Sequence, residues 1–235
     1  MPRVSRAVAE QRRQQVIESV SRLIREKGAE QVSVPEAMAA AGLTHGGFYR
    51  HFSSKDDLVA QALAAAFDER GRSIPPATGA EAPAGAGEPA DAGKPADAGE
   101  PAHAGEAAHA GEPGVARPAD RSARAAFLAA YLSERHRDNP ARGCAAAALA
   151  ADVARTEPGT ALRAAFTTGL HDMVDSLRRL DGAPDGADSD SALVELSTLV
   201  GALLLARASD DDALSRDILR AAHQHLTAQS DASRA

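Results

Sequence analysis

A low-complexity stretch of 45 residues, from Pro75 to Ala119, divides the chain and limits what it can fold into. It contains 16 Ala, 8 Gly and 8 Pro, and a hexapeptide repeat runs through it from Gly87. Val115 is its only larger aliphatic residue, so burial of apolar surface cannot offset the entropic cost of ordering its backbone. We therefore expect a disordered insertion at residues 75–119 between folded parts at residues 1–72 and 120–235.

Both flanking parts show the periodicity of helices. Apolar residues between Ala7 and Lys27 recur at i, i+1, i+4, i+7 and i+8, which places them on one face of a helix. Hydrophobic residues make up 44% of the chain but aromatics only 3%, a composition that favours helices over sheets. No segment alternates like a strand, so we predict an all-α protein. Further helices are expected near residues 34–42, 44–52, from Ser53 or Ser54 onward, and at 121–137, 143–155, 158–180, 189–208 and 211–229.

Several classes of protein are excluded by what the sequence lacks. Cys144 is the only cysteine, so no internal disulfide can form, and there is neither a signal peptide nor an uninterrupted apolar run of 18 residues. We expect a cytoplasmic protein that does not enter the membrane. The nucleophile, phosphate-loop, dinucleotide and zinc motifs of common enzymes are also missing, so we expect no enzyme, no cofactor and no metal site.

The charge is unevenly distributed. The whole chain has 26 Lys and Arg against 33 Asp and Glu, but residues 1–55 alone have nine Lys and Arg against five Glu. A basic N-terminal part on an acidic body is expected when one end of a protein meets a polyanion.

The segment from Val32 to Val59 predicts a helix-turn-helix, in which the second of two short helices enters the major groove of DNA. Phe48 and Phe52 are four residues apart and are expected to anchor that helix to its neighbours. The residues between them then face outward. We expect base contacts from the helix N-terminus, phosphate contacts from the polar side chains that follow, and close backbone approach at the glycines. The predicted DNA-binding residues are Ser33, Thr44, His45, Gly46, Gly47, Tyr49, Arg50, His51 and Lys55.

This segment resembles the TetR family of bacterial transcriptional regulators over about residues 8–70. The most specific matches are Gly42-Leu43-Thr44 with Gly46, Phe48-Tyr49-Arg50-His51-Phe52, and Ser54-Lys55-Asp56-Asp57-Leu58. Gly47 departs from the hydroxyl residue that is common at its position. The resemblance implies a three-helix helix-turn-helix DNA-binding domain and a larger C-terminal helical domain that binds a ligand and dimerises. It also implies that the last two helices form a four-helix bundle with a second subunit.

Two features of the C-terminal domain are candidates for sensing. Cys144 follows Arg142-Gly143 at the start of a helix, where the helix dipole and a guanidinium lower a thiol pKa, and some TetR-like regulators sense electrophiles through a similar Gly-Cys. The alternative is a small buried thiol. A pocket for a modest, largely apolar effector is expected among the apolar residues of this domain, with Phe127, Tyr131, Phe166 and Leu170 as candidates.

These features together predict a homodimeric repressor that binds double-stranded operator DNA of palindromic sequence. An unknown small-molecule effector, or modification of Cys144, releases it. The alternative is a helical small-molecule-binding protein with a non-functional DNA-binding head.

Overall fold

The structure, a computed structural model, describes residues 6–71, 118–180 and 189–232, and these contain helices and no strand. The all-α prediction is therefore confirmed. The elements in order are α1 (Arg6–Lys27), α2 (Val34–Ala40), the 3₁₀-helix η1 (His45–Arg50), α3 (Lys55–Gly71), α4 (Pro118–Tyr131), α5 (Glu134–Arg137), the 3₁₀-helix η2 (Pro140–Arg142), α6 (Ala145–Arg155), α7 (Ala161–Leu180), α8 (Asp190–Ala208) and α9 (Asp212–Ala232).

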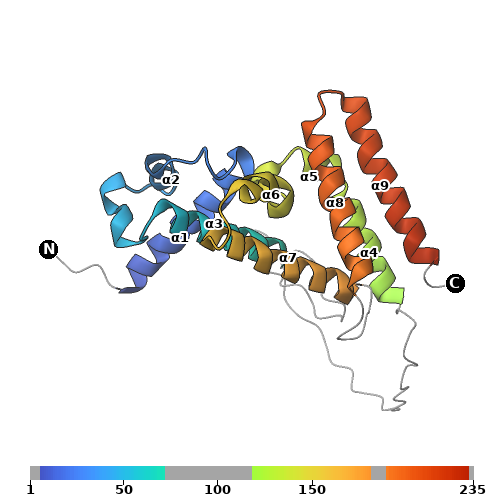
Figure 1. The fold of residues 1–235 in the computed structure, drawn as a ribbon, viewed down its shortest axis with the longest axis horizontal. Helices are drawn as coiled ribbons and strands as arrows, with labels where there is room; N and C mark the ends of the chain where they lie inside the picture. Colours follow the sequence, from blue (N-terminus) through green and yellow to red (C-terminus); the bar gives the residue numbers. More distant parts are fainter. Residues whose placement is uncertain (1–5, 72–117, 181–188, 233–235) are drawn as a thin grey trace, which may run out of the picture.

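The first four elements form one end of the molecule, which we call the head (Figure 1). Its core consists of the apolar stripe of α1 packed against α2, η1 and α3. Phe48 and Phe52 are 1% and 2% exposed, with ring centroids 5.6 Å apart. The prediction that these two rings anchor η1 is confirmed.

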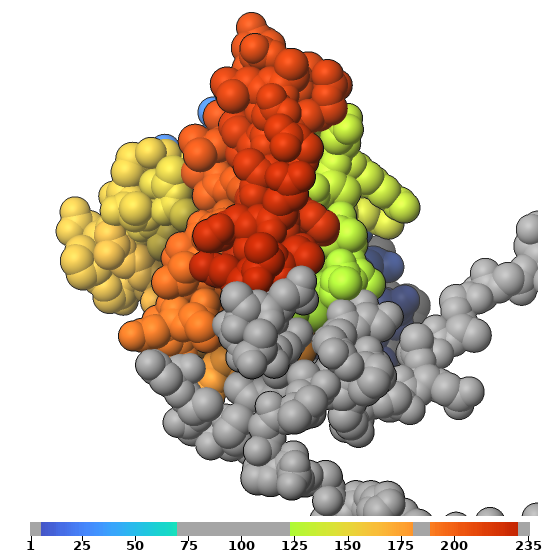
Figure 2. Space-filling view, turned by 90° about the vertical axis from the view of Figure 1, so that its right-hand side faces the viewer, coloured from blue at the N-terminus to red at the C-terminus, as the bar shows by residue number. Residues whose placement is uncertain are grey.

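Helices α4 to α9 form the body. Helix α7 runs along α3, while α8 and α9 form an antiparallel hairpin at the far end from the head (Figure 1). Seen from that end, α9 lies in front, with α8 on one side and α4 on the other (Figure 2). One continuous set of buried apolar side chains runs from Val16 in α1 to Leu226 in α9, so head and body share a core.

Three sequence-based boundaries need correction. The helix expected at residues 121–137 is two helices, α4 and α5, because Ser133 starts a new one by accepting a hydrogen bond from the His136 amide. The third helix of the head is a 3₁₀-helix, and the expected Thr44 side-chain cap is absent from it. Residues 75–117 of the predicted insertion lie outside the described residues, and its last two residues begin α4.

The junction between η1 and α3 is fixed by Asp57. One of its carboxylate oxygens accepts hydrogen bonds from the Ser53 amide at 3.0 Å and the Ser53 hydroxyl at 2.9 Å, and the other accepts one from Gln61 at 2.6 Å. The Ser53 amide and the other donors lower the Asp57 pKa, because they stabilise the ionised form. The Ser54 hydroxyl accepts a hydrogen bond from the Asp57 amide, as expected of a cap for this helix.

The contact between α3 and α7 requires a glycine. The Phe67 ring of α3 lies directly on Gly169 of α7, where even a methyl group would overlap the ring. Phe166, one turn earlier on α7, meets the Phe67 ring edge-on with centroids 5.8 Å apart. The two helices therefore approach closely at this point, and the Phe67 ring contacts both Gly169 and Phe166 of α7.

Helix α8 is apolar on nearly all sides. Among the described residues it is the one helix long and apolar enough to cross a membrane by length and composition. Its Glu195 is nevertheless buried in the body, 2.9 Å from the Arg124 guanidinium of α4. A helix that packs one face on a protein core through an ion pair and remains apolar on the other face is typical of an interface between subunits.

We predict that Gly169→Ala destabilises the protein by about 1–3 kcal/mol, because the added methyl group forces Phe67 away from α7. The free energy of unfolding from urea denaturation measures this. Thr168→Ala, at the exposed neighbouring position, should change it by less than about 0.5 kcal/mol. Equal effects of the two changes would show that the ring contact does not constrain the helices.

We also predict a pH-dependent loss of stability from Asp57→Asn. The folded-state pKa of Asp57 lies below its ordinary value of 3.8, so its ionised form contributes stability above that value, and the contribution is lost as pH falls through the lowered pKa. The variant should be about 1 kcal/mol less stable than wild type at pH 7. The difference should shrink below about pH 4 in denaturation curves recorded at a series of pH values. A difference that is constant with pH would contradict the assignment.

Candidate functional site

The 3₁₀-helix η1 presents a polar outer surface on a buried aromatic base. Phe48 points into the head, and its neighbour Tyr49 is 77% exposed. His45 and Arg50 are also exposed, as is Thr44, which precedes the helix. Five of the residues predicted from the sequence are thus exposed in or beside η1: Thr44, His45, Gly46, Tyr49 and Arg50.

Arg13 of α1 fixes the position of η1. Its Nε donates a hydrogen bond to the His51 carbonyl at 3.3 Å, and its Nη2 donates to the Gln61 side chain of α3. The guanidinium also lies over the Phe52 ring, 5.5 Å from the centroid. From the sequence alone, Arg13 is only one of the cations of the basic N-terminal part. Its partners lie 38 and 48 residues away, so no local pattern indicates this role.

Ser33 and Lys55 lie beside η1 at the ends of their helices. Ser33 caps α2, and its hydroxyl oxygen accepts a hydrogen bond from the Glu36 amide at 3.3 Å, which leaves the hydroxyl proton free to be donated. Lys55 donates to the Glu30 carbonyl at 3.0 Å, and its ammonium group has two further protons. The neighbouring Lys27 and Glu36 form an ion pair at 2.6 Å that raises the pKa of Lys27 and lowers that of Glu36.

Three of the predicted residues are less exposed than the others: Gly47, His51 and Lys55. Gly47 is half-buried, and a side chain there would point at the Met38 methyl group of α2. Its Cα therefore packs against the preceding helix instead of facing outward like Gly46. His51 is half-buried, with its ring beside Phe52 and its carbonyl bound by Arg13.

The body contains a largely apolar cavity of about 360 Å³ between α6, α7 and α8. Of the four apolar candidates, Phe166 and Leu170 line it. Phe127 and Tyr131 lie instead in the core, where the Tyr131 ring packs against Phe127 and His136. The polar side chains of the lining are Thr167, His171 and Ser197, and the rest of it is Ala146, Ala150, Val174, Leu193, Leu196 and Val200.

Cys144 is fully buried at the N-cap of α6. Its amide donates a hydrogen bond to His136 Nε2 at 3.0 Å, and His136 Nδ1 lies 2.7 Å from the Tyr131 carbonyl. Because Nε2 accepts and Nδ1 must donate, the His136 imidazole is neutral with its proton on Nδ1. On the other side of the same peptide, the Gly143 carbonyl accepts a hydrogen bond from Arg25 of α1 at 3.2 Å. The Gly143–Cys144 peptide thus joins head and body.

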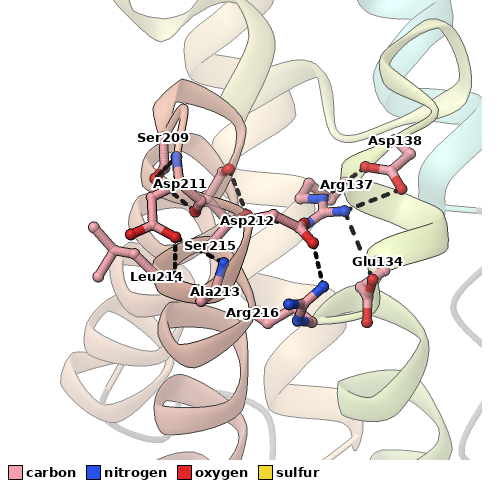
Figure 3. A network of polar contacts seen from close by, with 11 residues as sticks. Glu134, Arg137, Asp138, Ser209, Asp211, Asp212, Ala213, Leu214, Ser215 and Arg216 are labelled. Carbon is pink, nitrogen blue, oxygen red and sulfur yellow. Dashed lines mark hydrogen bonds and ion pairs between the residues drawn. The ribbon is translucent and has the colours of Figure 1, made fainter.

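A polar network holds the α8–α9 turn to α5 (Figure 3). Arg137 donates to the Asp212 carboxylate at 3.0 Å and the Ser215 hydroxyl at 2.9 Å, and it pairs with Asp138 at 2.6 Å. These carboxylates, Asp138 first, raise the pKa of Arg137 above its ordinary value. Arg207 of α8 adds hydrogen bonds to the His136 and Arg137 carbonyls. An open polar hollow of about 560 Å³ adjoins this network. The three arginines in its lining, Arg25, Arg137 and Arg207, all bind protein acceptors.

Comparison with known proteins agrees with these features. Residues 16–62 match the family model described as bacterial regulatory proteins, tetR family. No curated protein sequence matches the chain.

The whole fold is shared with solved structures of low sequence identity. The reduced form of NemR from Escherichia coli is 16% identical, with a TM-score of 0.62, over 92% of this chain and 94% of that one. A TetR transcriptional regulator from Chloroflexus aurantiacus is 20% identical, with a TM-score of 0.59, over 94% of each chain. A TetR-family regulator from Agrobacterium tumefaciens is 17% identical, with a TM-score of 0.59, over 92% and 98%. The head therefore matches the tetR family model, and the chain as a whole is similar in fold to these solved TetR-family regulators.

Proposed function

We propose that the protein is a homodimeric repressor that places η1 in the major groove of a palindromic operator and leaves the DNA when an apolar effector fills the α6–α7–α8 cavity. The observation that carries this proposal is the exposed polar surface of η1, supported from beneath by Phe48 and Phe52 and held by Arg13. The protein acts in the cytoplasm, where bacterial operators lie.

Within the head, the contacts divide into two kinds. His45 and Thr44 at the start of η1 reach base edges, and Gly46 lets the backbone approach them. Tyr49, Arg50 and Lys55 donate to phosphates, as does the Ser33 hydroxyl at the start of α2. Gly47 and His51 act mainly by packing and by positioning η1.

The second subunit covers the outer face of α8 and the start of α9. Large apolar side chains are exposed there, a surface that a monomer rarely leaves in water: Leu193, Val194, Leu204, Leu205 and Leu214. Gly201 lies on the same face of α8, with no atom within 4 Å of where its side chain would be, so a partner helix can approach closely. A second copy of this face meets it by two-fold symmetry, which matches the symmetry of a palindromic operator.

The effector is a modest apolar molecule, because the cavity lining offers hydrogen bonds only from Thr167, His171 and Ser197. Modification of Cys144 is a second route to release. The thiol is buried, so a reagent reaches it when the segment around Gly143 opens, and a group added there would displace the peptide that Arg25 and His136 hold.

Selection of random duplex DNA by the purified protein tests DNA binding directly. We expect an enriched palindrome and an affinity that falls steeply with salt concentration, because several phosphates are contacted. His45→Ala should relax base preference by about 1–3 kcal/mol at particular positions. Tyr49→Phe, which removes only the hydroxyl, should weaken binding to all sequences by about 1 kcal/mol.

Failure to enrich any sequence at low salt would favour the alternative, a small-molecule-binding protein whose head does not function. An unchanged selected site for His45→Ala would show that η1 does not read bases in the proposed way. Repeating the selection after alkylation of Cys144 separates the two routes of release, since loss of the motif would assign a role to the thiol.

Dimerisation is tested by Leu205→Glu, which places a charge on the outer face of α8, where Leu205 is 59% exposed. We expect the variant to be a folded monomer in sedimentation experiments, with operator affinity reduced at least tenfold. Ala154→Glu, which adds the same charge at an exposed position of α6, should remain dimeric. A dimeric Leu205→Glu variant would place the interface elsewhere.

A further inference from the structure

We propose that the ring contact between Phe166 and Phe67 transmits occupancy of the cavity to the DNA-binding head. This inference rests on the proposed function, and it assigns regulation of DNA binding to one contact out of several that join head and body.

Phe166 belongs both to the cavity lining and to the contact between α7 and α3. Its side chain lines the α6–α7–α8 cavity, and its ring also meets the edge of the Phe67 ring of α3, with centroids 5.8 Å apart and planes at 75°. A molecule that fills the cavity and displaces the Phe166 ring therefore acts on α3 directly.

Phe67 is closely packed on two sides. It is 6% exposed, and its ring lies on the Gly169 backbone, closer than any side chain there would allow. The Phe67 ring lies between the Gly169 backbone and the Phe166 ring. Because close-packed protein interiors deform little, a displacement of the Phe67 ring displaces α3 as well. The α3 helix therefore moves when Phe166 moves.

Movement of α3 reaches η1 through a rigid junction. Helix α3 starts at Lys55, five residues after η1 ends at Arg50, and Asp57 fixes the intervening turn through both Ser53 donors. Gln61 of α3 is also bound by Arg13, which holds the His51 carbonyl. A shift of α3 thus changes the position of η1, and with it the spacing of the two heads of a dimer.

A second route from the cavity to the head runs through the contacts of α6 with α1 and with the residues that follow α1. Asp152 of α6 accepts a hydrogen bond from the Ala29 amide at 2.9 Å, and the Gly143 carbonyl binds Arg25. However, α6 lines the cavity only with Ala146 and Ala150. Because their side chains are single methyl groups, a bound ligand has no large α6 side chain to displace. The geometry therefore favours the Phe166–Phe67 route over the α6 route.

A double-mutant cycle tests this without the effector, using substitutions that fill the cavity in its place. Ala150→Phe and Thr167→Phe are two independent fillers from α6 and α7. Ala151→Phe and Thr168→Phe are their matched controls at exposed neighbouring positions outside the lining. Each of these four substitutions is made in three backgrounds: the wild-type protein, the Phe67→Leu variant and the Asp152→Ala variant. The readout is affinity for the duplex that wild type selects, measured on variants whose circular dichroism and thermal melting show a folded protein.

We expect either filler to weaken DNA binding at least tenfold in wild type and in Asp152→Ala, but less than threefold in Phe67→Leu. The controls should change affinity less than threefold in every background. An undiminished effect in Phe67→Leu, or an effect lost in Asp152→Ala instead, would overturn the proposal. Folded fillers that leave wild-type affinity unchanged would overturn it as well. Wild-type protein that selects no duplex would refute the proposed function itself, which is a distinct outcome.

Discussion

The packing of α3 on α7 is the contact on which the rest of the structure depends. Helix α3 closes the core of the head through Leu58 and Leu63, and its other end lies against the body through Phe67. Because Gly169 lets the two helices approach closely, head and body share one core. This shared core is the basis of the coupling between cavity and head that we propose.

A second connection is polar. The Gly143–Cys144 peptide is held through its carbonyl by Arg25 and through its amide by His136. Arg25 in turn pairs with Glu69 of α3 at 2.5 Å. A buried arginine that loses its partners is costly, so this connection resists opening and protects the Cys144 thiol.

Helix α8 shows how an apolar sequence is distributed among different environments. Its inner face is buried in the body, its flank lines the cavity through Leu196 and Val200, and its outer face exposes Val194 and Leu205. The same helix thus contributes to the core, to the lining of the α6–α7–α8 cavity and to the proposed dimer interface. This arrangement explains why α8 has the composition of a membrane helix while Glu195 forms an ion pair inside the protein.

The sequence by itself determined the local features: helices from their periodicity, the positions of most breaks, the anchoring role of Phe48 and Phe52, and the exposure of most residues predicted around η1, although not of Gly47, His51 and Lys55. These follow from the spacing of side chains along a helix and from capping, which act over a few residues. The sequence did not distinguish residues that line a cavity of the body from residues buried in its core. The candidates Phe127, Tyr131, Phe166 and Leu170 are all large, apolar and helical, so they look alike in sequence. Only tertiary packing decided that Phe166 lines the α6–α7–α8 cavity while Tyr131 is fully buried in the core. The roles of Arg13, His136 and Gly169 were likewise decided by tertiary structure, because each depends on a partner that belongs to another element of the fold.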